Sequence, residues 1–343
     1  MRDYLIRRTL LMIPTLIGIT ILAFSITRIV PGGPIEQLII QAQQGGRGDE
    51  SGGGKVKTNS SRQGLSDDDI QYLKELYGFD KPLPIAYWDW LTRILVLDLG
   101  ESYRYYEPVW DIVIERVPVA LYYGLMTTLL TYLICIPLGV LKAMNDKTWF
   151  DSISSLLIYA GYAFPGFVFG LLLLVYFGSY LEWFPMGGFT GDDFDELGFF
   201  GKVRDIIYHS VLPMAAYLVS SFATMTVLQK NTLLENLGAD YIRTAFAKGL
   251  PRKRVILKHA LRNSLIPIAA TFGHNISLVF TGQYLIEFIF NIDGLGLLGY
   301  ESVVNRDYPV VLGTLLLSSL FYLVGNLLSD ICLASVDPRI RFH

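Results

Sequence analysis

The chain has 343 residues, of which 52% are hydrophobic and only 17% charged, and its mean hydropathy is +0.41. This composition excludes an ordinary soluble domain and favours an all-α integral membrane protein. The formal net charge of -3 hides an uneven distribution of charge along the chain. Cys135 and Cys332 both fall in apolar runs, so we predict packing roles for them and neither a disulfide nor a metal site.

Six apolar stretches approach the roughly 20 residues that cross the hydrocarbon core of a bilayer. They are residues 9–30, 118–141, 152–177, 210–228, 264–288 and 310–333. We therefore predict six transmembrane helices, with both ends of the chain on one side of the membrane. The first stretch is too long for a cleaved signal peptide and lacks an A-x-A site, so we expect it to remain as a span.

The predicted organisation has three parts. Residues 1–30 form the N-terminal span, residues 31–117 form an extracytoplasmic segment, and residues 118–343 form a five-helix core. Within the second part, the Gly- and Ser-rich composition of residues 41–64 predicts a mobile insertion. Residues 178–209 and 289–309 are expected on the same outer side.

Two short helices are predicted in the outer segment. A capping-box pattern at Ser66 and Asp69 predicts a helix that runs through Tyr77. Residues 85–99 form an amphipathic stretch that is too short and too charged to be a seventh span. This second helix could cap the outer mouth of a pore or lie on the membrane surface.

A strongly basic segment, residues 229–263, lies between the fourth and fifth apolar stretches. Its acidic residues are Glu235 and Asp240 alone, and its basic residues are Lys230, Arg243, Lys248, Arg252, Lys253, Arg254, Lys258 and Arg262. The positive-inside rule places such a segment in the cytoplasm. The basic residues Arg7 and Arg8, Lys142 and Lys147, and Arg339 and Arg341 follow the same pattern at the other ends expected inside.

This basic segment carries the signals of a helical hairpin. Asp240 is a candidate N-cap, Gly249 is a typical helix stop, and Pro251 suits the first turn of a second helix. We therefore expect two short, rigid helices that could bind a cytosolic protein. A basic loop that only binds lipid headgroups is the alternative.

Chemistry within the chain itself is not expected. In the Gly-rich segment at residues 48–57, Val56 replaces the Ser or Thr of a nucleotide-binding loop. The four histidines form no H-E-x-x-H motif, and no serine or cysteine sits in a nucleophile elbow. We predict no catalytic residues, no metal site, no cofactor and no nucleic-acid partner.

Polar residues in or near the spans are candidates for a solute pathway, because polar groups in a membrane are costly unless they face a cavity or one another. The pathway candidates are His274, Asn275, Gln283 and Glu287. Hydrogen bonding between helices is the alternative for each of them. An ion-driven secondary transporter, with Glu287, Asp330 and His274 as protonatable groups, and a structural or receptor-like membrane protein are the competing classes.

The hairpin also carries a family resemblance. The sequence DYIRTAFAKGLPRKRVILKHALRNSLIP at residues 240–267 resembles the coupling loop of peptide-type ABC importer permeases. In that family, the EAA region of this loop docks into a cleft of a separate ATPase. The resemblance implies that the ATPase-coupling residues are Asp240, Tyr241, Arg243, Thr244, Ala245, Ala247, Lys248, Gly249 and Pro251. Arg243 departs from the general E-A-A-x-x-x-G pattern, since it stands at the acidic position.

The likeness extends over nearly the whole chain, including PGGP at residues 31–34, GYAFPGFVFG at 161–170 and NIDGLGLLGYE at 291–301. The PGGP form, the Gly-rich insertion near residues 45–64 and the NIDGLGLLGYE form are most similar to the B subunits of Yej-type permeases, a group implicated in uptake of oligopeptides and of peptide antibiotics such as microcin C. The resemblance implies a type I ABC importer permease fold in a bacterial inner membrane. Nickel, opine and oligosaccharide importers share this architecture and remain alternatives for the cargo.

The same resemblance implies a set of partners. They are a second permease subunit, one or two cytoplasmic ATPase subunits that bind ATP and Mg²⁺, an extracytoplasmic solute-binding protein, a peptide substrate and membrane lipids. Both chain termini are expected in the cytoplasm.

Overall fold

The computed structural model describes residues 2–29, 71, 80–272 and 283–336. Regular structure within these ranges is helical, apart from one isolated bridge between Glu101 and Pro108. The chain divides into two compact units. The core unit comprises Met1–Ile13, Ile114–Tyr300 and Ser318–His343, and the second unit comprises Pro14–Val113 and Glu301–Leu317.

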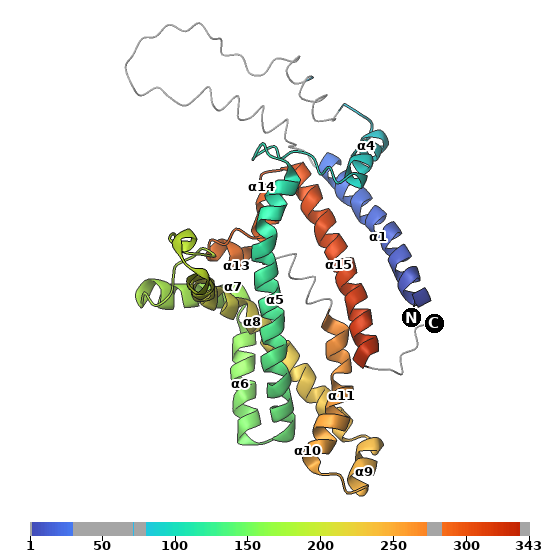
Figure 1. The fold of residues 1–343 in the computed structure, drawn as a ribbon, viewed down its shortest axis with the longest axis vertical. Coiled ribbons are helices and arrows are strands. Elements are labelled where there is room, and N and C mark those ends of the chain that lie inside the picture. The colour runs from blue at the N-terminus through green and yellow to red at the C-terminus, as the bar shows by residue number, and fades with distance from the viewer. Residues whose placement is uncertain (1, 30–70, 72–79, 273–282, 337–343) are drawn as a thin grey trace. The chain divides into compact units, whose positions relative to one another are not determined.

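Three helices are each long and apolar enough to cross a membrane (Figure 1). They are α1 (Arg2–Ile29), α5 (Val109–Met144) and α15 (Tyr308–Val336). They correspond to the first, second and sixth predicted spans. Two bent helix pairs raise the number of candidate spans in the described residues to five.

The third predicted span, residues 152–177, is not one continuous helix. It consists of α6 (Trp149–Ala163), α7 (Gly166–Leu173) and the π-helix η1 (Leu174–Tyr180), with a bend of 95° between α6 and the remainder. Pro165 causes the break, because a residue that precedes proline avoids the helical conformation. Phe164 is accordingly extended, with φ -96° and ψ 132°.

The fourth and fifth predicted spans also differ from expectation. Helix α8 (Phe199–Leu237) begins about three turns before residue 210 and bends by 50° between Val219 and Ser221. The fifth predicted span runs through residues 273–282, which lie outside the described residues. Its two ends are helical, and α13 (Tyr284–Ile289) follows the gap.

In the core unit, α5, α7, α8 and α13 contribute to one apolar core that combines aliphatic and aromatic side chains. Tyr123, Leu174, Tyr217 and Phe290 are buried in it. A Cβ added at Gly170 would lie 2.9 Å from the Cβ of Ala216, so this glycine permits α7 to approach α8 closely. A separate small cluster buries Cys135 with Met225 and Ile268, which confirms the predicted packing role of that cysteine.

The second unit contains α4 (Leu83–Leu95), which confirms a helix within the amphipathic stretch 85–99. This helix ends at Leu95, and Leu97 then takes a positive φ of 62°. Ala86 of α4 packs with Phe24 and Leu312. Of the predicted helix after Ser66, the structure describes Gln71 alone, and the Gly-rich insertion at residues 41–64 lies outside the described residues.

Candidate functional site

The basic segment 229–263 forms a hairpin whose first limb is the end of α8. The tip carries α9 (Asp240–Ala247). The second limb is a succession of helical pieces, namely α10 (Arg252–Arg254), the π-helix η3 (Val255–Ala260) and α11 (Leu261–Ser264). One short helix is therefore confirmed, whereas the predicted second short helix is part of a longer helical run. We call residues 229–264 the coupling hairpin; α9 and α10 are labelled in Figure 1.

The start of α9 differs from the sequence prediction. Ala239 occupies the N-cap position with φ -75° and ψ 149°, and Asp240 is the first helical residue. The side chain of Asp240 makes no capping hydrogen bond, so its prediction as the N-cap is wrong. A carboxylate in the first turn still interacts favourably with the helix dipole.

The end of α9 is a Schellman motif built on Gly249. This residue has φ +73°, a conformation that glycine adopts without steric penalty. Its N–H donates to the carbonyl of Phe246 at 2.9 Å, and the N–H of Leu250 donates to the carbonyl of Ala245 at 3.4 Å. Leu250 also packs against the cluster that contains Ala245, as this motif favours. The predicted helix stop at Gly249 is confirmed.

Pro251 starts the second limb from just outside the helix. It is the N-cap of α10, with φ -65° and ψ 141°, rather than a residue of its first turn. The fixed φ of proline suits this extended entry into the helix. Its missing backbone N–H costs no hydrogen bond there, because the first N–H groups of a helix have no partner within the helix.

Helix α9 has one buried face and one exposed face. Ile242 is 1% exposed, and both it and Ala245 belong to a buried apolar cluster with Val140 of α5, Leu233 of α8 and Val255 of η3. Of the other predicted coupling residues, the exposed ones are Asp240, Tyr241, Arg243, Thr244, Ala247, Lys248, Gly249 and Pro251. Ile242 was not among the predicted residues, although an isoleucine three positions before Ala245 has the spacing of a buried helix stripe.

Polar contacts on the exposed face are local. Tyr241 donates its hydroxyl to Oδ1 of Asn236 at 2.7 Å, and Thr244 donates to the carbonyl of Asp240 at 3.0 Å. Arg243 approaches Asp240 at 3.4 Å, but both side chains are largely exposed, so this pair adds little stability. Apolar packing of Ile242 and Ala245 therefore holds α9 in place, and the charged side chains remain open to a partner.

The pathway candidates are spread over different environments. His274 and Asn275 lie outside the described residues. Gln283 is exposed at the start of α13. Glu287 is only 3% exposed, and its Oε2 accepts a hydrogen bond at 2.6 Å from the backbone N–H of Leu297, in the first turn of α14 (Leu295–Val304). The structure thus gives Glu287 a helix-capping contact, and its pathway role stays a prediction.

Asp330, a protonatable candidate in the ion-driven alternative, is engaged in the core unit. Its Oδ2 accepts a hydrogen bond from the Tyr4 hydroxyl at 2.9 Å and lies 3.3 Å from Nε of Arg8. These contacts join the start of α1 to the end of α15. Within the described residues there is no group of three or more His, Cys, Asp or Glu side chains that could hold a metal ion.

Comparison with known proteins defines the class to which this helical membrane protein belongs. The family described as "Binding-protein-dependent transport system inner membrane component" matches residues 135–342, more than half of the chain. The chain belongs to this family. It is a multi-pass inner-membrane permease component of an ABC transport system and is not the ATPase.

Curated relatives match the chain over its full length. The "Peptidoglycan transport system permease protein YejB" of Agrobacterium fabrum is 42% identical over 100% of this chain and 99% of its own length. The "Inner membrane ABC transporter permease protein YejB" of Escherichia coli O157:H7 is 40% identical, with both chains covered completely. The "Oligopeptide transport system permease protein AppB" of Bacillus subtilis is 35% identical, also with 100% of each chain covered.

Proposed function

We propose that this chain is the six-span permease subunit of a type I ABC importer for oligopeptides or peptide-like solutes. In this proposal, residues 31–117 form an extracytoplasmic segment, and the basic hairpin and both termini face the cytoplasm. Three to five candidate spans in the described residues are compatible with six, since the fifth predicted span includes residues 273–282. The charge distribution supports the orientation.

The observation that carries the proposal is that α9 has one buried face and one exposed face. Its buried face is anchored to α5, α8 and η3, while its polar face is unobstructed in the isolated chain. Such a helix can receive a force from a cytoplasmic partner and pass it to the bundle. We propose that α9 docks on an ATPase subunit, through the exposed coupling residues together with Phe246, which is 44% exposed.

The partner ATPase subunits, one chain or two, would bind ATP and Mg²⁺ and supply the energy. This chain would convert the displacement of α9 into a change between inward and outward access. Such a change is a shift between two packings of the bundle, driven by the different affinity of the two states for ATP. A second permease subunit would complete the pathway, and a solute-binding protein would deliver the cargo.

The choice of a peptide cargo rests on the relatives. Their printed names refer to peptidoglycan and oligopeptide transport, and the "Dipeptide transport system permease protein DppB" of Escherichia coli K12 is 33% identical over 99% of both chains. Peptide bonds are common to all three kinds of cargo. We therefore propose a peptide or a peptide-containing solute rather than a metal ion or a simple sugar.

Purification of the complex in lipid, followed by ATPase and uptake assays, tests this function. We expect an ATPase subunit and a second permease to copurify, and we expect reconstituted vesicles to take up short peptides only with ATP and the solute-binding protein. Uptake by this chain alone, driven by a proton gradient, would contradict the proposal. Competition with unlabelled peptides, oligosaccharides and Ni²⁺ separates the cargo classes.

A further inference from the structure

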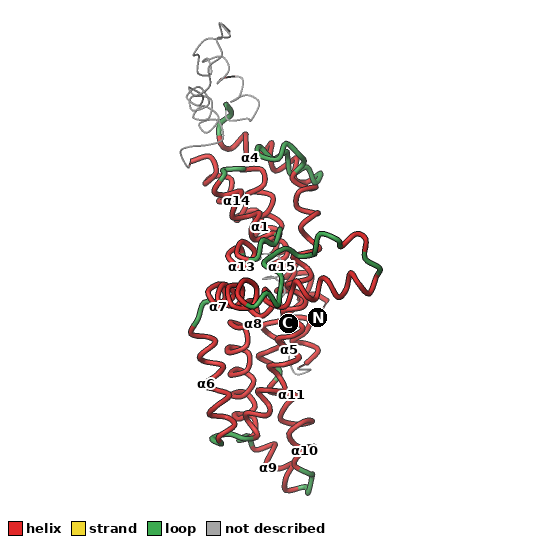
Figure 2. The backbone as a smooth tube through the Cα atoms, turned by 90° about the vertical axis from the view of Figure 1, so that its left-hand side faces the viewer, coloured by secondary structure: helices red, strands yellow, loops and turns green. Residues whose placement is uncertain are grey.

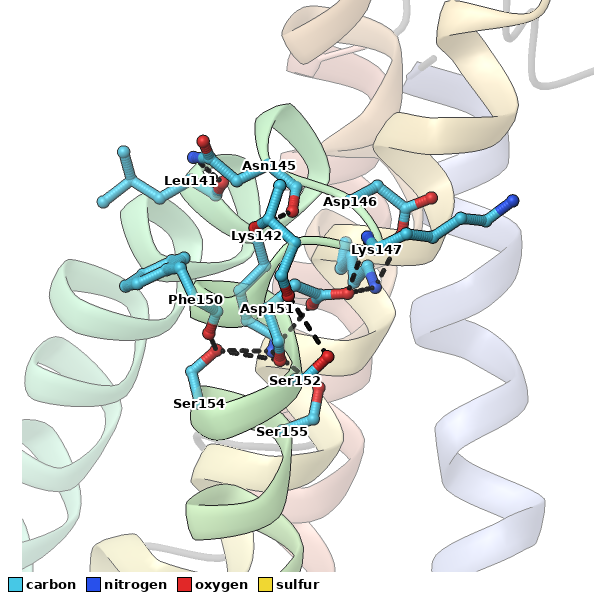
Figure 3. A network of polar contacts seen from close by, with 12 residues as sticks. Leu141, Lys142, Asn145, Asp146, Lys147, Phe150, Asp151, Ser152, Ser154 and Ser155 are labelled. Atoms are coloured by element: carbon cyan, nitrogen blue, oxygen red, sulfur yellow. Dashed lines mark hydrogen bonds and ion pairs between the residues drawn. The ribbon is translucent and has the colours of Figure 1, made fainter.

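A charged cluster lies in the core unit where the turn between α5 and α6 meets α8 (Figure 3). It consists of Lys142 at the end of α5, Asp146 in the turn, Asp151 in the first turn of α6 and Lys230 in α8. From the sequence, Lys142 is expected to be an exposed positive charge. In the structure its side chain is only 1% exposed, and the side chain of Asp151 is 9% exposed. We call these four residues the turn cluster.

Lys142 ties the end of α5 to the first turns of α6. Its Nζ lies 3.0 Å from Oδ1 of Asp151 and donates to the backbone carbonyl of the same residue at 2.9 Å. It also donates to the hydroxyls of Ser154 at 2.7 Å and Ser155 at 2.8 Å. Three hydrogen-bond acceptors, together with the ion-pair contact to Oδ1 of Asp151, thus surround the three N–H groups of one buried ammonium.

Lys230 ties α8 to the same turn. Its Nζ lies 2.7 Å from Oδ2 of Asp151 and 2.9 Å from Oδ1 of Asp146. The carboxylate of Asp151 is therefore shared between a lysine of α5 and a lysine of α8. The backbone N–H of Lys147 adds a hydrogen bond to Oδ2 at 3.3 Å. The sequence gives no sign of this arrangement, because Asp151 and Lys230 are 79 residues apart.

Close packing surrounds the turn cluster on the side of the hairpin. A Cβ added at Gly139 would lie 2.7 Å from Cβ of Gln229 and 3.0 Å from the carbonyl oxygen of Thr226, so α5 and α8 are in direct contact one turn before Lys142. The neighbour of Lys230, Gln229, donates from Nε2 to the hydroxyl of Ser264 at 3.0 Å. This bond connects α8 to α11 at the base of the second limb.

The apolar anchor of α9 is contiguous with the turn cluster. Val140 and Ala143 flank Lys142 on α5, and Leu233 follows Lys230 by one turn on α8. All three belong to the apolar cluster that buries Ile242 of α9. Figures 1 and 2 both draw the α5–α6 turn and α9 toward the same end of this unit. The apolar anchor of α9 therefore includes residues of α5 and α8, two of the three helices that the turn cluster joins.

Burial of these charges is not the most stabilising way to fill the site. Removing ions from water is costly, and well-packed apolar residues often stabilise a protein as much as a buried ion pair or more. A shared carboxylate with several directional contacts does, however, restrict how three helices can be arranged. This property suits a joint that must keep its geometry while the rest of the bundle moves.

We propose that Lys142, Asp151 and Lys230 are positioning residues that make the α5–α6 turn, the end of α8 and α9 move as one rigid block. The turn cluster transmits the displacement of α9 to α6, in addition to α5 and α8, which share a buried cluster with α9. This inference rests on the coupling role of α9 in the proposed function. It adds a second route from the ATPase to the bundle. This route runs through α6, to which the turn cluster, and not α9 itself, provides the connection.

Substitution of Lys230 tests the inference in the reconstituted complete transporter. Lys230→Met should leave ATP hydrolysis detectable but lower peptide uptake per ATP by about tenfold, within the usual range of coupling between sites. Lys230→Arg, which keeps the cation, should restore most of the coupling. Lys202→Met is the matched control, because Lys202 lies on the same helix with a weak 3.9 Å contact to Asp195. Unchanged uptake per ATP in Lys230→Met would overturn the inference.

A milder variant keeps the test decisive if Lys230→Met does not assemble. Asp146 is 30% exposed and contacts only Lys230 among the ion pairs of the described residues, so Asp146→Asn leaves the buried Lys142–Asp151 pair intact. This variant should assemble and show a smaller loss of uptake per ATP. Wild-type uptake per ATP in an assembled Asp146→Asn transporter would then count against the inference.

A distance measurement tests the rigid block itself. Spin labels at Lys147→Cys and at Glu235→Cys, an exposed position at the end of α8, with the native cysteines replaced by alanine, report the separation of two parts of the block. We expect the same narrow distance distribution without nucleotide and with ATP, and a broader one after Lys230→Met. If the distance in the wild type changes with nucleotide while ATP-driven uptake persists, the rigid-block inference is overturned. Failure of the proposed function would instead appear as absence of ATP-driven uptake in the wild type.

Discussion

Gly249 determines how the coupling hairpin turns after α9. Its φ of +73° lies in the left-handed region, and no atom lies within 4 Å of a Cβ added there. A side chain at this position therefore meets no steric obstacle from neighbours and is penalised by the backbone alone. The cost for an L-residue is about 1–2 kcal/mol, and β-branched residues tolerate this region least.

We predict that Gly249→Val keeps the protein in the membrane but lowers ATP-driven uptake by about tenfold or more, since about 1.4 kcal/mol corresponds to a factor of ten. The physical reason is that the Schellman turn opens and α9 loses its fixed direction. Membrane fractionation and uptake in reconstituted vesicles measure the two effects.

Gly238 provides the control for this substitution. It precedes α9 on the same hairpin but has a helical φ of -78°. Gly238→Ala should therefore be nearly neutral, whereas Gly249→Ala should show a smaller version of the valine defect. Normal uptake by Gly249→Val would contradict the role assigned to the turn.

For the helix α9 as a whole, substitutions on its two faces should have different effects, one on stability and the other on binding of the ATPase. We predict that Ile242→Ala loosens the hairpin, because truncation of a buried isoleucine costs about 2–5 kcal/mol. Phe246→Ala should leave stability nearly unchanged, since Phe246 is 44% exposed, but should weaken association with the ATPase. Thermal unfolding in detergent and copurification of the ATPase measure the two properties. Equal effects of both substitutions on both properties would show that α9 has no distinct docking face.

Sequence patterns identified those elements whose signals are local. The stop at Gly249, the short helix α9 and the amphipathic α4 follow from residue types within a few positions of each other. The same reasoning placed the N-cap one residue late, because the extended Ala239 offers no side-chain signal. It also treated residues 152–177 as one span, since a hydropathy window averages over the single proline at which the helix breaks.

At the scale of the whole molecule, the pairing of distant residues could not be predicted. Lys142 and Asp151 are each unremarkable near the end of an apolar stretch, and their burial depends on the approach of Lys230 from α8. Asp330 is a second case. It was a candidate for proton coupling, and the structure pairs it with Tyr4 and Arg8 at the start of the chain.

We predict that Asp330→Asn retains ATP-driven uptake with no new dependence on a proton gradient. The change removes one charge from a pair in which Arg8 is 46% exposed, so stability should fall by only about 0–1 kcal/mol. Uptake assays with and without a protonophore measure the outcome. A different result would favour the secondary-transporter class: wild-type uptake that depends on the proton gradient and not on ATP, and loss of that uptake in Asp330→Asn.

The central claim is that α9 faces the cytoplasm and docks on an ATPase. A single cysteine at Ala247→Cys, in a chain whose Cys135 and Cys332 are replaced by alanine, tests both parts with a membrane-impermeant maleimide. We expect rapid labelling in inside-out vesicles stripped of the ATPase, protection when the ATPase is added back, and no labelling in right-side-out vesicles. Labelling from the outer side, or unchanged labelling with the ATPase bound, would contradict it.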